Sequence, residues 1–112
     1  MYLGIDCGTQ GTKALVLDAD SGQVLGAGSA SHSLQSAANG RREQQPGQWL
    51  EAFEQATRQA LAAAGIRGEQ ILGIGVSGQQ HGLVLLDEQG AVLRPAKLWC
   101  DTESTPENQR LL

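Results

Sequence analysis

One loop near the start of the chain carries the strongest chemical signal: Gly4-Ile5-Asp6-Cys7-Gly8-Thr9-Gln10-Gly11-Thr12-Lys13. Its two loop glycines let backbone N–H groups approach an anion, because no Cβ stands in the way, and a concavity of such groups holds phosphate oxygens. The Asp6 carboxylate would repel a bare phosphate at close range. A divalent cation removes this conflict, since Mg²⁺ commonly sits between carboxylates and substrate phosphates. The loop therefore predicts a site for Mg²⁺ and the phosphates of a nucleotide.

Two other glycine-rich phosphate loops do not fit this sequence. The chain has no Gly-x-x-x-x-Gly-Lys-Ser/Thr string of a P-loop, and a dinucleotide-binding fingerprint would need glycine in place of Asp6 and a helix behind the loop. Instead the aliphatic run Ala14 to Leu17 stops at a turn cluster, residues 18–22, which favours a strand. We expect the loop to be the turn of a β-hairpin. A hairpin turn that merely uses glycine and threonine remains the alternative.

Composition excludes several classes of protein. The 112 residues suffice for one domain with a modest core, and 40% hydrophobic with 18% charged residues describe a globular chain. A net charge of −4 argues against a nucleic-acid partner, and no run approaches the roughly 18 apolar residues of a membrane helix. Cys7 and Cys100 fit no metal-binding spacing, so we expect a reduced, cytoplasmic protein. Because a helix starting at Thr105-Pro106-Glu107 stops at Leu112, we expect an N-terminal portion of a longer protein.

The order of elements predicts a mixed sheet with a helix on at least one face. We expect strands over residues 2–7, 12–17, 23–30, 71–76 and 83–86, with a return segment at 91–93. The 71–76 strand is almost wholly apolar, as in strands covered on both faces. Residues 31–45 read as an exposed loop with His32 facing solvent. A helix runs from Pro46 to Gly65 and packs on the sheet through a stripe of Trp49, Leu50, Phe53, Ala56, Ala60, Leu61 and Ala64.

A second polar group follows the 71–76 strand. Residues 77–82 read Ser-Gly-Gln-Gln-His-Gly, and if this strand runs parallel to the first, both loops open on the same edge of the sheet. Gln79, Gln80 and His81 could then supply hydrogen bonds to a polyhydroxylated ligand; a plain polar turn is the alternative. Trp99 and Asp101 could add an apolar ring wall and a carboxylate, although a core tryptophan and a helix-capping aspartate explain them nearly as well.

These motifs together resemble the FGGY carbohydrate kinases, and within them the xylulokinase branch. The opening loop looks like the family's first phosphate motif, which all actin-like ATPases share. Residues 43–49, Glu-Gln-Gln-Pro-Gly-Gln-Trp, are similar to its Glu-x-x-Pro-x-x-Trp segment. Residues 73–82 look like the sugar-contacting loop, and residues 94–101 resemble its Pro-x-x-x-Trp-x-Asp segment. Four motifs in this order cover nearly the whole chain.

The resemblance implies an α/β, RNase H-like (actin-like ATPase) fold, of which residues 1–112 would be the N-terminal part of the sugar-binding domain. It implies phosphoryl transfer from Mg-ATP to a keto-sugar, D-xylulose giving xylulose 5-phosphate; ribulose, gluconate and glycerol are the alternative substrates. The catalytic aspartate and the adenosine-binding domain would lie downstream, so the 112 residues alone should be inactive. The resemblance leaves open whether the protein forms a homodimer. The implied residues are Asp6 for Mg²⁺ through water and for catalysis, Gly8, Thr9, Gln10, Gly11 and Lys13 for the phosphates, and Gln80, His81, Trp99 and Asp101 for the sugar.

Two functions therefore compete. One is a sugar kinase; the other is a non-catalytic, actin-like nucleotide-binding module. Gln80 and His81 favour the kinase, because a nucleotide sensor needs no sugar contacts. Glycerol kinases carry Arg-Glu at this pair, so the resemblance favours xylulose over glycerol.

Overall fold

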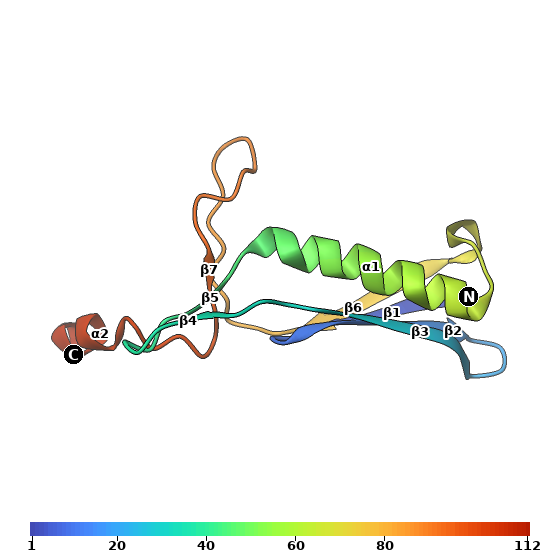
Figure 1. Cartoon of the computed structure of the whole chain (residues 1–112), viewed down its shortest axis with the longest axis horizontal. Coiled ribbons are helices and arrows are strands. Elements are labelled where there is room, and N and C mark those ends of the chain that lie inside the picture. Colours follow the sequence, from blue (N-terminus) through green and yellow to red (C-terminus); the bar gives the residue numbers. More distant parts are fainter. The chain divides into compact units, whose positions relative to one another are not determined.

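The structure is a computed structural model that describes all residues, 1–112 (Figure 1). The chain divides into two compact units. The first unit contains Met1–His32 and Gly47–Gln79, and the second contains Ser33–Pro46 and Gln80–Leu112. Each unit is described by itself below.

The first unit is built on a four-stranded mixed sheet in the order β3-β2-β1-β6. Strands β1 (Tyr2–Cys7), β2 (Gly11–Asp18) and β3 (Gln23–Ser31) form an antiparallel meander, as the alternating residues and intervening turns predicted. Strand β6 (Gly73–Gly78) pairs with β1 in parallel. The carboxyl ends of β1 and β6 therefore lie at the same edge of the sheet, which meets the condition set for the two strands from the sequence.

Helix α1, Pro46–Ala64, lies along one face of this sheet (Figure 1). Proline suits the first helical turn, where its missing N–H leaves no bond unmade, and Gly65 follows the helix with a φ of 67°. Helix and sheet share one core of Leu3, Ile5, Ala14, Val16, Ala56 and Ala60. This confirms the packing of the helix on the sheet. Leu50 was wrongly placed in the buried stripe, because its side chain is 73% exposed.

Two glycines of β3 allow the close approach of α1. A Cβ on Gly26 would lie 2.4 Å from the carbonyl oxygen of Ala60, and one on Gly28 would lie 2.3 Å from that of Ala56. Real Cβ atoms do not come this close to backbone atoms. The small residues on both surfaces therefore set the distance between the helix and the sheet.

Within residues 1–112, the strand at 71–76 is not covered on both faces as predicted. Strand β6 is the edge of the described sheet, and Ile74 and Val76 are 56% and 71% exposed. The core joins α1 to β1 and β2 and does not include β6. Residues 68–70 form a short 3₁₀ helix, η1 (Gly68–Gln70), before this strand.

The second unit contains a small sheet in the order β4-β5-β7, formed by Gln35–Ser36, Arg42–Gln44 and Ala96–Lys97. The 31–45 segment is therefore not the uniformly exposed loop that its polarity predicted, since Glu43 and Gln44 are buried. Residues 83–86 form isolated bridges with Lys97 and Val92 instead of the expected strand. Helix α2 spans Thr105–Leu111 and has Pro106 in its first turn, as predicted.

No helix of the structure is both long and apolar enough to span a membrane.

Candidate nucleotide and sugar site

The predicted phosphate loop is the turn between β1 and β2. The N–H of Gly8 donates to the carbonyl oxygen of Gly11 at 2.9 Å and closes the turn. A Cβ on Gly11 would lie 2.6 Å from the carbonyl oxygen of Ala30, so this position accepts only glycine without a shift of β3. The loop is thus the hairpin turn that the sequence predicted. Backbone packing requires glycine at position 11, whereas a Cβ on Gly8 would make only an ordinary contact, 3.4 Å from the carbonyl oxygen of Gly11.

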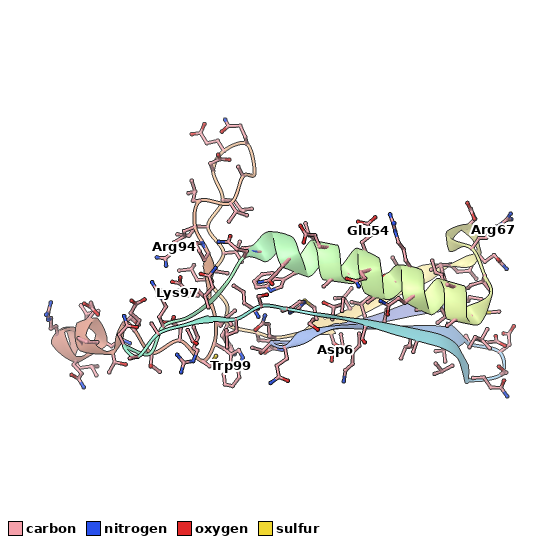
Figure 2. All side chains as sticks on the ribbon, viewed as in Figure 1. Asp6, Glu54, Arg67, Arg94, Lys97 and Trp99 are labelled. Carbon is pink, nitrogen blue, oxygen red and sulfur yellow. The ribbon has the colours of Figure 1, made fainter.

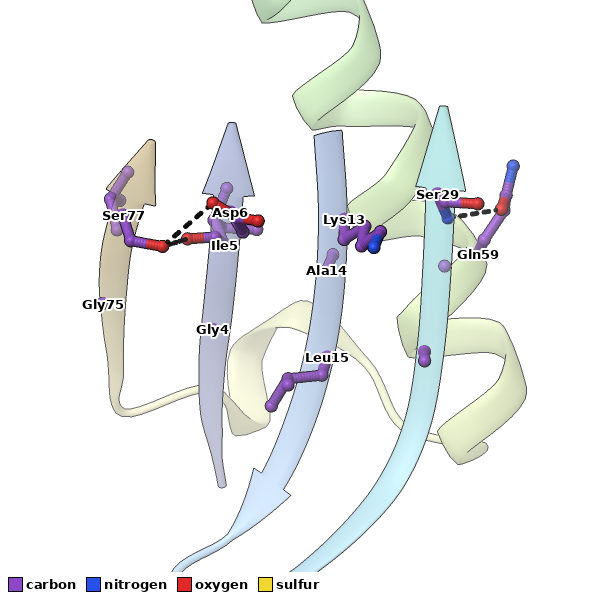
Figure 3. Close-up of a pocket in the computed structure, with 13 residues that line it drawn as sticks. Gly4, Ile5, Asp6, Lys13, Ala14, Leu15, Ser29, Gln59, Gly75 and Ser77 are labelled. Atoms are coloured by element: carbon purple, nitrogen blue, oxygen red, sulfur yellow. Dashed lines mark hydrogen bonds between the residues drawn. The ribbon is translucent and has the colours of Figure 1, made fainter. Parts of the chain in front are cut away.

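A row of polar residues crosses the sheet next to this loop (Figure 3). Asp6 of β1 is paired with Lys13 of β2 on one side and with Ser77 of β6 on the other, and Lys13 is paired with Ser29 of β3. Because side chains alternate along a strand, this row lies on the face opposite the one that packs on α1. The row lines a groove of about 930 Å³.

Asp6 and Lys13 are cross-strand partners of opposite charge, yet no ion pair joins them. Ser77 Oγ donates to Asp6 Oδ1 at 3.1 Å, and the other carboxylate oxygen accepts no hydrogen bond from the protein. Both side chains are exposed. A carboxylate oxygen is a preferred ligand of Mg²⁺ or its bound waters, and a lysine ammonium is a suitable partner for phosphate. The donor set therefore fits a magnesium–phosphate group at this end of the sheet.

A buried histidine on the other side of the loop was missed. We expected His32 to face solvent, but its side chain is only 9% exposed. A hydrogen bond of 2.9 Å joins His32 Nε2 to Thr12 Oγ1. The backbone N–H of His32 donates to the carbonyl oxygen of Gln10 at 2.9 Å. His32 Nδ1 is buried and has no partner. The polar sequence around His32 gave no sign of this burial, because the threonine that bonds the imidazole lies 20 residues earlier in the chain.

The expected sugar residues Gln80, His81, Trp99 and Asp101 belong to the second unit, whereas the expected phosphate residues belong to the first. Within the second unit, Gln80 and His81 are exposed. His81 has a φ of 60°, and no other non-glycine residue has a positive φ. Such a left-handed conformation is uncommon outside glycine and is frequent at ligand sites.

Trp99 is 61% exposed, so the alternative of a core tryptophan was wrong. Asp101 does not cap α2 either. Its carboxylate accepts the N–H of Arg42 at 2.7 Å and the N–H of Glu103 at 3.1 Å, and Lys97 Nζ lies 3.3 Å from both of its oxygens. A sugar hydroxyl at Asp101 would therefore share an oxygen with these donors.

Lys97 is the centre of an ion cluster within the second unit; Figure 2 labels Lys97 and Arg94. Its ammonium lies 2.6 Å from Glu103, 3.2 Å from Glu43 and 3.3 Å from Asp101, and Arg94 also pairs with Glu43. The hydrogen bond to Glu103 is the main cause that raises the pKa of Lys97 above its ordinary value. The same bond lowers the pKa of Glu103.

Opposing effects act on the pKa of the Asp101 carboxyl group. Burial acts to raise its pKa, but the backbone N–H groups of Arg42 and Glu103, together with Lys97, outweigh it and leave the pKa below its ordinary value. The three carboxylates of the cluster come close enough to hold a metal ion. Lys97 already supplies the positive charge there. The cluster therefore has a structural role, because its ion pairs join β5, β7 and the segment before α2.

Solved structures define the class of this fold. The structure matches a xyloylose kinase from Brucella ovis with a TM-score of 0.88 at 42% identity, covering 98% of this chain and 23% of that chain. It also matches a gluconate kinase from Lactobacillus acidophilus with a TM-score of 0.86 at 24% identity, covering 97% of this chain and 21% of that one. The second match shows the fold alone. The fold is that of the sugar kinases of the actin-like ATPase type.

Sequence comparison gives the family. A xylulose kinase from Haemophilus influenzae is 54% identical over 116 residues, which covers 100% of this chain and 24% of that protein. Residues 1–112 match the model of the N-terminal domain of the FGGY family of carbohydrate kinases. The chain belongs to this family. It spans about a quarter of the length of the relative from Haemophilus influenzae.

Proposed function

We propose that the protein to which this chain belongs is an ATP-dependent sugar kinase that converts D-xylulose to xylulose 5-phosphate. The observation that carries the proposal is the edge of the first sheet, where Asp6 and Lys13 lie opposite each other without an ion pair beside a glycine hairpin turn. Two unpaired, opposite charges at a phosphate loop suit a ligand that carries both a cation and an anion.

In this proposal the chain's own residues bind and orient the reactants. The backbone of Gly8 to Gly11 holds phosphate oxygens, and Lys13 balances their charge. Asp6 holds hydrated Mg²⁺, which supplies charge stabilisation when bound. Phosphoryl transfer depends almost wholly on positioning and charge stabilisation, so these roles account for the part of catalysis assigned to this chain.

Gln80, His81, Trp99 and Asp101 form the proposed sugar side. Gln80 and His81 are exposed polar groups, the backbone of His81 has a left-handed conformation, and Trp99 offers an exposed aromatic face. A sugar presents hydroxyls for the polar groups and C–H surface for an aromatic ring. Support for xylulose comes from the relatives named xylulose kinase and from the residues at positions 80 and 81.

A coupled ADP-release assay on the full-length protein tests the proposal. Xylulose, ribulose, gluconate and glycerol are each varied at saturating Mg-ATP. We expect the highest kcat/KM with xylulose. A higher value with gluconate or glycerol would replace the substrate and keep the kinase. No turnover with any sugar, combined with tight binding of Mg-ATP, would instead favour the non-catalytic nucleotide-binding module.

A further inference from the structure

The end of β6 is bonded directly to the phosphate loop. Thr9 Oγ1 in the loop donates to Gln79 Oε1 at 3.1 Å, although 70 residues separate the two in sequence. The N–H of Gln79 also donates to the carbonyl oxygen of Cys7 at 2.9 Å. One glutamine therefore contacts the loop with both its backbone and its side chain.

This junction leaves little room for independent movement. Gly78 is paired with Cys7 in the parallel register, and a Cβ on Gly78 would lie 2.7 Å from the carbonyl oxygen of Cys7. The two backbones are thus in close contact just before Gln79. A change in the position of Gln79 must displace Thr9 or break their hydrogen bond.

Gln79 is also the residue directly before the proposed sugar contacts. Gln80 and His81 follow it in the chain, and His81 holds a left-handed backbone conformation. A sugar bound at Gln80 and His81 would order their backbone. Gln79, which is bonded to Thr9, lies only one residue before Gln80 and two before His81.

We propose that Gln79 is a positioning residue that couples sugar binding to nucleotide binding through its hydrogen bond to Thr9. This inference rests on the proposed function, because it needs both ligands. A ligand that fixes either end of the Thr9–Gln79 bond holds the other end in the geometry the second ligand requires. The two ligands then bind with positive coupling, and linkage requires each to raise the affinity for the other by the same factor.

Isothermal titration calorimetry on the full-length protein measures this factor. The dissociation constant of xylulose is determined with and without saturating Mg-AMP-PNP, and that of Mg-AMP-PNP with and without xylulose. We expect the wild-type protein to bind each ligand roughly 5- to 150-fold more tightly in the presence of the other, the usual range for coupled sites.

Variants isolate the hydrogen bond. Thr9→Val removes the hydroxyl and keeps the shape, and Gln79→Met removes the amide and keeps the length. Each is expected to bring the coupling factor close to 1, and the double variant to lower it no further, since either change breaks the same bond. Thr9→Ser keeps a hydroxyl and should retain the coupling.

Thr12→Val is the matched control, because it removes a hydroxyl three residues after Thr9, at the start of β2, that is bonded to His32 instead of Gln79. We expect its coupling factor to equal that of the wild type. A wild-type factor in Thr9→Val and Gln79→Met, both shown to be folded by circular dichroism, overturns the inference. A wild-type protein that binds both ligands with a factor of 1 overturns the coupling alone, whereas failure to bind xylulose overturns the proposed function as well.

Discussion

Ser77 Oγ donates a hydrogen bond to Asp6 Oδ1 at 3.1 Å, across the parallel pair formed by β6 and β1. The two residues are register partners. The end of β6 therefore fixes one oxygen of the Asp6 carboxylate and leaves the other without a hydrogen bond from the protein. This arrangement holds Asp6 at the groove beside the predicted phosphate loop (Figure 3).

Asp6→Asn is expected to lower kcat of the full-length enzyme by about a hundredfold or more with little loss of stability. Asparagine keeps an oxygen for Ser77 but removes the charge that would hold hydrated Mg²⁺, and loss of one charge-stabilising group commonly costs this much. Steady-state kinetics at saturating Mg²⁺ measures the change. Asp18→Asn removes the same charge from the far end of β2, where Ser21 bonds the carboxylate, and should leave kcat unchanged. A near-wild-type kcat in Asp6→Asn would make Asp6 a structural residue.

His81→Ala is expected to raise the KM for xylulose and leave the KM for ATP unchanged. Loss of one hydrogen bond to a neutral hydroxyl costs about 0.5–1.5 kcal/mol, which corresponds to a roughly 2- to 13-fold effect. If His81 were the general base, the loss would be about 10²- to 10⁴-fold and would fall on kcat.

The left-handed backbone at His81 calls for a second variant. Because glycine adopts a φ of 60° without strain, His81→Gly removes the imidazole and relieves the backbone. If the contact with the sugar matters, both variants share the rise in KM. Recovery of the wild-type KM in His81→Gly would show that backbone strain caused the effect in His81→Ala.

Lys97→Met should destabilise the protein by about 1–3 kcal/mol at pH 7, less than the ~3–5 kcal/mol of a fully buried pair, since the Lys97 side chain is 24% exposed. Without the ammonium, Glu43, Asp101 and Glu103 repel one another. Chemical denaturation of both proteins gives the difference. An Arg58→Met control breaks an exposed pair with Glu54 on α1 and should cost no more than about 0.5 kcal/mol.

The same cluster predicts an effect of pH. Asp101 and Glu103 have lowered pKa values in the folded protein, so their stabilising effect is present above their unfolded pKa values, near pH 4. It is lost as pH falls through the folded values. The wild-type protein should therefore lose stability from about pH 4 downward. In Lys97→Met, acidification relieves repulsion, and the gap between the two proteins should narrow; a constant gap from pH 7 to pH 3 would contradict the account.

Gly28→Ala should destabilise the protein by about 1–3 kcal/mol, the usual cost of overpacking a filled core. The added Cβ would meet the backbone of α1 at 2.3 Å, and a backbone carbonyl cannot turn aside as a side chain can. Gly47→Ala, a glycine substitution within α1 itself, adds a Cβ that meets nothing within 4 Å and should be neutral or stabilising. Thermal melting of both variants decides the matter, and equal melting temperatures would show that the helix can shift.

Local patterns predicted the first unit well. The apolar alternation of β1 and β2, the turn at residues 18–22 and the helical stripe of α1 each follow from short-range periodicity. The same reasoning placed the predicted phosphate loop at a hairpin turn. These features depend on neighbours in sequence, so one sequence is enough to find them.

Long-range contacts accounted for the errors. His32 is buried because of Thr12, and Glu43 is buried because Lys97 and Arg94 approach it from residues more than 50 positions away. Polar residues in a polar segment carry no signal of such partners. Strand β6 was expected to be covered because it is apolar, yet no element within residues 1–112 covers both of its faces. The Thr9–Gln79 bond likewise became visible only once β1 and β6 were paired.

An experimental structure of the full-length enzyme with Mg-AMP-PNP and xylulose tests the central claim most directly. We predict phosphate oxygens at hydrogen-bond distance, about 3 Å, from the backbone N–H groups of Gly8 to Gly11. We also predict a magnesium-bound water on Asp6 and sugar hydroxyls on Gln80 and His81. Phosphates bound elsewhere, with the turn between β1 and β2 empty and Asp6 without a metal-bound water, would contradict the account.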